Sequence, residues 1–137
     1  MSATATLLVG LLCLGAVMTA ALGVYAFRHR QEPGADAFVV LMAILTNWSV
    51  VYAAGLLTHE AFWRLVWLRL VWLSTGTIEV WLLLFALAYT GHDGFVTRKT
   101  VAALHVVPAL VIAATWTNPW HRLFWAEHSV VVADGLV

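Results

Sequence analysis

Four long apolar stretches follow one another along the chain, and short polar segments separate them. They cover residues 3–27, 37–57, 65–89 and 100–117. Each meets or approaches the ~20 residues that an α-helix needs to cross ~30 Å of hydrocarbon. None shows the period of two that is typical of a half-buried strand. The pattern predicts an all-α integral membrane protein, a four-helix antiparallel transmembrane bundle that forms a single domain over residues 1–137.

The polar segments indicate where the helices begin and end. Asp36 is a candidate N-cap for the second helix. Gly91 follows Tyr89 at the end of the third helix, where a glycine can take the left-handed C-cap conformation. Asn118 and Pro119 suit the start of a new helix, with the asparagine as N-cap and the proline at its first position. Residues 118–137 are therefore expected to form an incomplete segment in the outer interface.

Composition supports a lipid environment. Hydrophobic residues make up 63% of the chain and charged residues 10%, whereas a soluble domain is about half apolar and about a quarter charged. The net charge of zero provides no basic face, so nucleic acid is not an expected partner. The first stretch lacks a preceding basic region and is too long for a signal peptide, which favours a retained helix.

Basic residues concentrate in the first and third connections, which hold Arg28, Arg30, Arg98 and Lys99. Because Lys and Arg favour the cytoplasmic side, we expect a multi-pass protein of the cell membrane with its N-terminus outside. Arg64 and Arg69, near the outer end of the third helix, oppose this orientation.

Glu79 is the most informative polar residue, because it lies within the third apolar stretch. A carboxylate in lipid usually faces a bundle interior or a watery cavity. It can be neutral through protonation, or it can pair with a donor at similar depth, for which Asn47 is the candidate. Thr75 lies one turn away on the same helix. A functional role and a purely structural interhelical hydrogen bond both stay open.

Two further positions are candidates for function. Pro108 interrupts the fourth helix by leaving the carbonyl of Leu104 without a donor, and the resulting kink is either a hinge or a static bend. His121 lies at the expected outer face, where it could contact a ligand or a proton or could simply pack in the interface. Only His105 among six histidines lies clearly within a span, so neither a metal nor another cofactor is expected. No catalytic motif occurs, and we expect no enzymatic activity in this chain.

Three motifs in the second half carry a family resemblance. The chain reads Trp-Leu-Arg at residues 67–69, Tyr-Thr-Gly at residues 89–91, and Thr-Asn-Pro-Trp-His-Arg-Leu-Phe-Trp at residues 117–125. In this order they resemble the N-terminal seven-helix sensor region of bacterial and haloarchaeal histidine kinases. The resemblance implies a membrane sensory module of signal transduction, here with only the first four helices and without the kinase domain. The family often has a proline midway along the third helix, where this chain reads Gly-Thr-Ile-Glu at residues 76–79.

The sequence is compatible with two functions, one sensory and one in transport. The first is a sensory input module, whose partners would be the lipid bilayer, a kinase domain in a longer protein, and other membrane chains or copies of itself. Oligomerisation is expected because four helices of a seven-helix design leave helix faces unpaired. The second is a small oligomeric proton-coupled transporter that uses Glu79.

Overall fold

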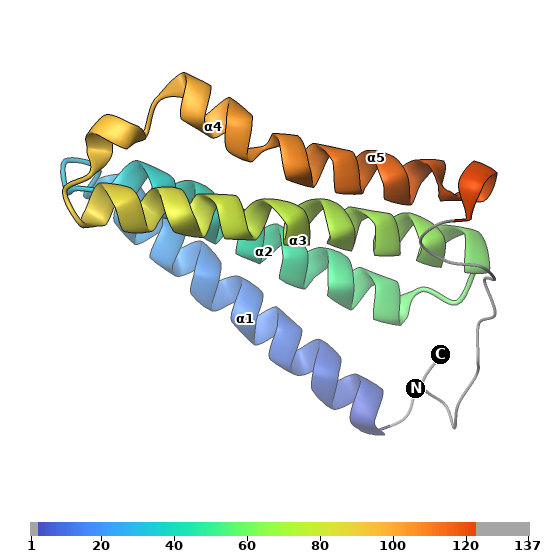
Figure 1. The fold of residues 1–137 in the computed structure, drawn as a ribbon. Coiled ribbons are helices and arrows are strands. Elements are labelled where there is room, and N and C mark those ends of the chain that lie inside the picture. Colours follow the sequence, from blue (N-terminus) through green and yellow to red (C-terminus); the bar gives the residue numbers. More distant parts are fainter. Residues whose placement is uncertain (1–2, 123–137) are drawn as a thin grey trace.

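The computed structural model describes residues 3–122, and in this part of the chain it contains helices and no strands (Figure 1). The elements are α1 Ala3–Arg28, α2 Ala35–Leu57, α3 Ala61–Tyr89, η1 Asp93–Phe95, α4 Arg98–Leu104 and α5 Val106–His121. The helices α1, α2 and α3 are each long and apolar enough to cross a membrane, and α4 with α5 forms a fourth such span. The predicted fold class is therefore confirmed.

The spans pack in chain order, each against its neighbour. Helix α1 packs on α2, α2 packs on α3, and α3 packs on α5 (Figure 1). Helix α1 diverges from α2 towards its own N-terminal end, and α4 rises away from α3 (Figure 1). The arrangement is an open row of antiparallel helices, and no other described helix covers the long apolar faces of α1 and α5.

Small residues allow the neighbouring helices to approach closely. A Cβ built on Gly23 of α1 would lie 3.2 Å from Met42 Cβ of α2. A Cβ on Gly55 of α2 would lie 3.3 Å from Trp67 Cβ of α3. Close approach through small residues is the usual basis of helix packing in lipid, where no hydrophobic driving force acts between helices. These two contacts also fix the register of α1 on α2 and of α2 on α3.

The turn between α1 and α2 packs against the end of α3. Gly34 has a φ of 79°, and a Cβ there would lie 3.3 Å from both the Phe85 ring and the Tyr89 backbone nitrogen. Gly34 itself is the N-cap of α2, so the prediction of Asp36 as N-cap is wrong. Asp36 lies in the first turn of α2, where its carboxylate accepts a bond of 2.7 Å from Arg30 Nε. Negative charge in a first turn also suits the helix dipole.

The end of α3 was predicted from its glycine and is confirmed. Gly91 adopts a φ of 77°. The His92 N–H donates to the Leu87 carbonyl at 2.8 Å, and the Gly91 N–H donates to the Ala88 carbonyl at 3.2 Å. This pair of bonds is a Schellman motif, which satisfies carbonyls that the helix end would otherwise leave unpaired.

The prediction that a new helix starts at Asn118 is wrong. Helix α5 continues through Pro119 to His121, and Asn118 is fully buried inside it. The Asn118 carbonyl accepts the Arg122 N–H at 2.8 Å, and the helix ends where Arg122 takes a φ of 51°. Pro119 has no N–H to donate to the Thr115 carbonyl, so the last turn of α5 has one hydrogen bond fewer, but the helix continues and ends only at the left-handed Arg122. Most of the predicted outer segment, residues 123–137, lies outside the described residues.

Candidate functional site

Two adjacent residues of α2 form hydrogen bonds to two adjacent residues of α3. Asn47 Nδ2 donates to Ser74 Oγ at 2.9 Å, and Trp48 Nε1 donates to Thr75 Oγ1 at 3.2 Å. Ser74 is buried, with 3% of its surface exposed. Interhelical bonds of this kind hold membrane helices in register. Asn47 thus contacts Ser74 and not Glu79, which lies five residues further along α3, about 7.5 Å along the axis.

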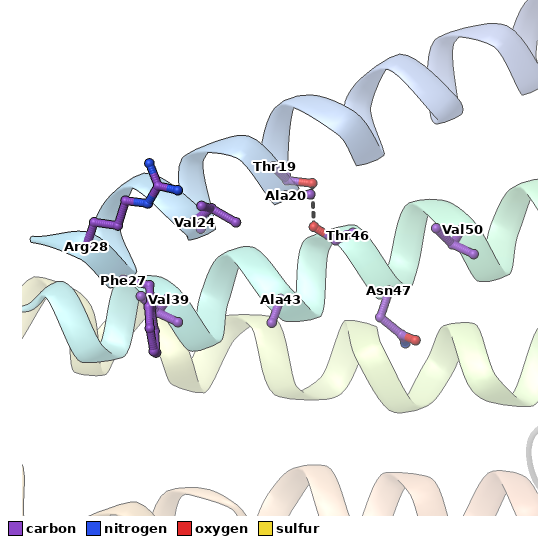
Figure 2. A pocket seen from close by; sticks show the side chains of 11 residues that line it. Thr19, Ala20, Val24, Phe27, Arg28, Val39, Ala43, Thr46, Asn47 and Val50 are labelled. Carbon is purple, nitrogen blue, oxygen red and sulfur yellow. Dashed lines mark hydrogen bonds between the residues drawn. The ribbon is translucent and has the colours of Figure 1, made fainter. Parts of the chain in front are cut away.

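A polar contact of the same kind connects α2 to α1. The hydroxyls of Thr19 and Thr46 lie 2.8 Å apart, and each also bonds to a carbonyl in the preceding turn of its own helix. This contact borders a groove of about 580 Å³ between α1 and α2, which is shown in Figure 2. The groove is otherwise mostly apolar, and Arg28 lies at its end near the α1–α2 turn. Thr46, Asn47 and Trp48 of α2 therefore form hydrogen bonds to both neighbouring helices, α1 and α3, at the same level of the bundle.

Glu79 lies in a cleft between α3 and the fourth span. The cleft encloses about 410 Å³ and is lined by Trp72, Thr75, Gly76, Glu79, Val80, Leu83, Leu104, Val107, Pro108 and Val111. It lies beside the junction of α4 and α5, where Figure 1 shows the fourth span bending away from α3. Three sequence-predicted candidates, Thr75, Glu79 and Pro108, therefore share one cleft. Asn47 and His121 do not belong to it.

Glu79 is the acidic side chain of this cleft. Its side chain is exposed, and within residues 3–122 it makes no hydrogen bond and no ion pair. Thr75, one turn earlier, donates to the Val71 carbonyl at 3.0 Å and accepts from Trp48. Since the remaining lining is apolar apart from Trp72 Nε1, the cleft offers one acidic group in an apolar setting.

The fourth span is interrupted at His105, three residues before Pro108. Helix α4 ends at Leu104 and α5 starts at Val106. Proline has no N–H to donate to the carbonyl four residues earlier, which is that of Leu104. Beside the break, His105 Nδ1 donates to the Val101 carbonyl at 2.8 Å, and the His105 ring lies edge-on to Trp81 with 6.0 Å between the ring centroids. The sequence identified Pro108 as the residue that interrupts the fourth helix. No sequence pattern predicts the contact between His105 and Trp81.

The N-terminal part of α3 and the C-terminal part of α5 are connected by a different kind of contact. The Arg69 guanidinium of α3 lies 5.5 Å from the ring centroid of Trp116 in α5, a cation–π contact. His121 Nε2 lies 2.9 Å from Thr117 Oγ1 on the same face of α5. Both His121 and Arg69 are thus engaged within the bundle. Among residues 3–122, no three His, Cys, Asp or Glu side chains lie where they could hold a metal ion.

The comparisons with known proteins agree with this architecture. The sequence model of the family described as the N-terminal 7TM region of histidine kinase matches residues 11–137. No curated protein and no solved structure matches the chain. A row of four apolar helices and a family match over nearly the whole chain define a membrane sensor region. The chain belongs to the family of N-terminal 7TM regions of histidine kinases, a region that is the input part of such kinases and not the catalytic part.

Proposed function

We propose that the chain senses a stimulus within the membrane or at its outer face, and that the fourth span moves against α3 in response. The observation that carries this proposal is the family match over residues 11–137. Signalling of this kind needs an element with two arrangements of similar energy. The fourth span, broken at His105, is the best candidate among the described helices.

The packing of the fourth span supports this role. Helix α5 has a smaller interface with α3 than α1 has with α2 or α2 has with α3. Helix α4 bends away from the bundle beside the cleft that holds Glu79 and Pro108 (Figure 1). An element with few packed contacts is the one that moves at low energy. Pro108 would then act as a hinge, and Glu79 as the group that responds to the stimulus.

Orientation follows from the distribution of charge over the two ends of the bundle. The α1–α2 turn and the α3–α4 connection lie at the same end (Figure 1). That end carries Arg28, Arg30, Arg98 and Lys99. We infer that this end faces the cytoplasm and that the N-terminus lies outside. His121, near the opposite end, would then lie at the outer face, where it is a candidate contact for an external ligand or proton.

The test of the sensory function begins with the open reading frame beyond Val137. If it encodes further apolar spans and a kinase, the whole protein is placed in membrane vesicles and its ATP-dependent autophosphorylation is measured. We expect Glu79→Gln and Pro108→Ala to change how phosphorylation responds to stimulus without abolishing basal phosphorylation. An in-frame stop codon, with no kinase that associates with the chain, would contradict the proposal.

A second function, a small oligomeric transporter, is favoured by one observation. The Glu79 carboxyl group makes no hydrogen bond or ion pair within the described part of the chain, which leaves it available to bind a proton or a cationic substrate. A transporter should move a substrate or protons across proteoliposome membranes and lose all transport in Glu79→Gln. A sensor should show no such flux in either form, so the assay separates the two functions.

A further inference from the structure

The cleft beside the α4–α5 junction combines a carboxylate with apolar walls. Glu79 lies one turn after Thr75 on α3, and Leu83 and Val80 continue the lining towards the α3–α4 end. Across the cleft stand Val107 and Pro108 of α5. A carboxylate inside a membrane span is strongly stabilised by a nearby positive charge, because the surrounding medium screens weakly.

The described part of the chain does not supply that charge. Glu79 has no ion pair within residues 3–122. Arg69, the other charged residue well inside α3, lies ten residues away, about 15 Å along the axis. Its guanidinium contacts Trp116 instead. The acidic cleft is therefore complementary to a cation that comes from outside these residues.

The aromatic wall favours the same kind of ligand. Trp72 lines the cleft together with Glu79. Indole rings attract cations through their faces, most strongly where water is excluded. The rest of the wall is aliphatic, which suits an apolar body. A hydrated metal ion would gain little from such a wall, because Glu79 and Thr75 offer too few oxygen ligands.

We propose that this cleft binds a lipophilic cation, a molecule with an apolar body and a fixed or protonated positive nitrogen or phosphorus centre. Its charge pairs with Glu79 and its body fills the space between α3 and the α4–α5 junction. The role of this ligand as a stimulus rests on the sensory function proposed above. Its binding to the cleft does not depend on that function.

Binding at this place has a direct structural consequence. The ligand occupies the cleft beside the place where Gly76 of α3 approaches Pro108 of α5. Filling the cleft beside this contact should open the angle between α4 and α3. Movement of α4 carries Arg98 and Lys99 with it, at the end of the span next to the α3–α4 connection.

The experiment uses two ions of nearly equal size and opposite charge. The whole chain is placed in nanodiscs of zwitterionic phosphatidylcholine, and equilibrium binding of tetraphenylphosphonium is measured with empty nanodiscs as background. We expect saturable binding of one cation per chain. Tetraphenylborate, the anionic counterpart, should neither bind saturably nor compete. Equal binding of both ions would overturn the proposal, since it would show an apolar pocket without charge selection.

Variants locate the site. Glu79→Gln keeps the size of the side chain and should weaken binding of the cation on the order of tenfold or more, as expected for loss of the negative partner of an ion pair. Glu60→Gln, outside the cleft at the N-cap of α3, is the matched control and should bind like the unmodified chain. Val111→Phe fills the cleft without changing charge and should also weaken binding. Circular dichroism of each variant checks that it is folded.

Unchanged affinity in both Glu79→Gln and Val111→Phe would place the cation elsewhere and overturn the assignment. The outcome is independent of signalling. If the cation binds in the cleft but leaves kinase phosphorylation unchanged, the binding site is confirmed and the cation is not a stimulus. If phosphorylation responds to other stimuli but the cation does not bind, the sensory proposal stands and the site fails.

Discussion

Gly76 of α3 faces Pro108 of α5, and one methyl group would fill the gap between them. A Cβ built on Gly76 would lie 3.6 Å from Pro108 Cβ and 3.8 Å from its Cα. These are ordinary van der Waals distances, so a methyl group fits at this position, and a longer side chain directed at Pro108 would press against it. The contact therefore sets how closely the fourth span approaches the rest of the bundle.

Substitutions at Gly76 test this contact. Gly76→Ala should leave the stability unchanged or raise it slightly, because alanine also has the higher helix propensity. Gly76→Leu should destabilise the chain by about 1–3 kcal/mol, as overpacking typically does. The free energy of unfolding in detergent, measured with increasing denaturant, gives both values. Equal stability of the two variants would show that the helices are not in contact here.

Pro108→Ala tests the cause of the break in the fourth span. Alanine restores the N–H that can donate to the Leu104 carbonyl, so α4 and α5 should join into one continuous helix. Spin labels at Lys99 and Trp116, read by pulsed electron resonance, should report a longer and more narrowly distributed distance in the variant. Val107→Ala, one residue earlier, is the matched control and should leave the distance distribution unchanged. An unchanged distance in Pro108→Ala would assign the break to another cause.

The bond between Asn47 and Ser74 should contribute measurably to stability. Removal of one interhelical hydrogen bond in a membrane protein costs about 0.6 kcal/mol on average and up to about 1.7 kcal/mol. We expect Asn47→Ala and Ser74→Ala each to lie in or near this range. In a double-mutant cycle, the two effects should add to more than the effect of the double variant. Strict additivity would mean that the two side chains do not interact.

The sequence predicted the elements well and the contacts between them less well. Hydropathy was sufficient to predict the four helices, and Gly91 was sufficient to predict the end of α3. Both features depend on the local sequence. The partner of Asn47 depends on the register of α2 against α3. That register is set by the approach of Gly55 to Trp67, a tertiary contact that no local pattern reveals. The sequence identified Glu79 as a candidate because it is an acidic residue in an apolar stretch. It did not predict that Glu79 lies in the same cleft as Pro108.

The orientation of the bundle can be tested with single cysteines. Cys13, the one cysteine of the chain, is first replaced by alanine, and one cysteine is then introduced at Glu60 or at Asp93. Glu60 lies in the α2–α3 connection and Asp93 in the α3–α4 connection, at opposite ends of the bundle (Figure 1). Because the basic residues near Asp93 favour the cytoplasm, a membrane-impermeant maleimide added to intact cells should label Glu60→Cys and not Asp93→Cys. Permeabilised cells should allow labelling of both, which controls for accessibility. The reverse pattern would place the N-terminus inside and move His121 to the cytoplasmic face, away from any external ligand.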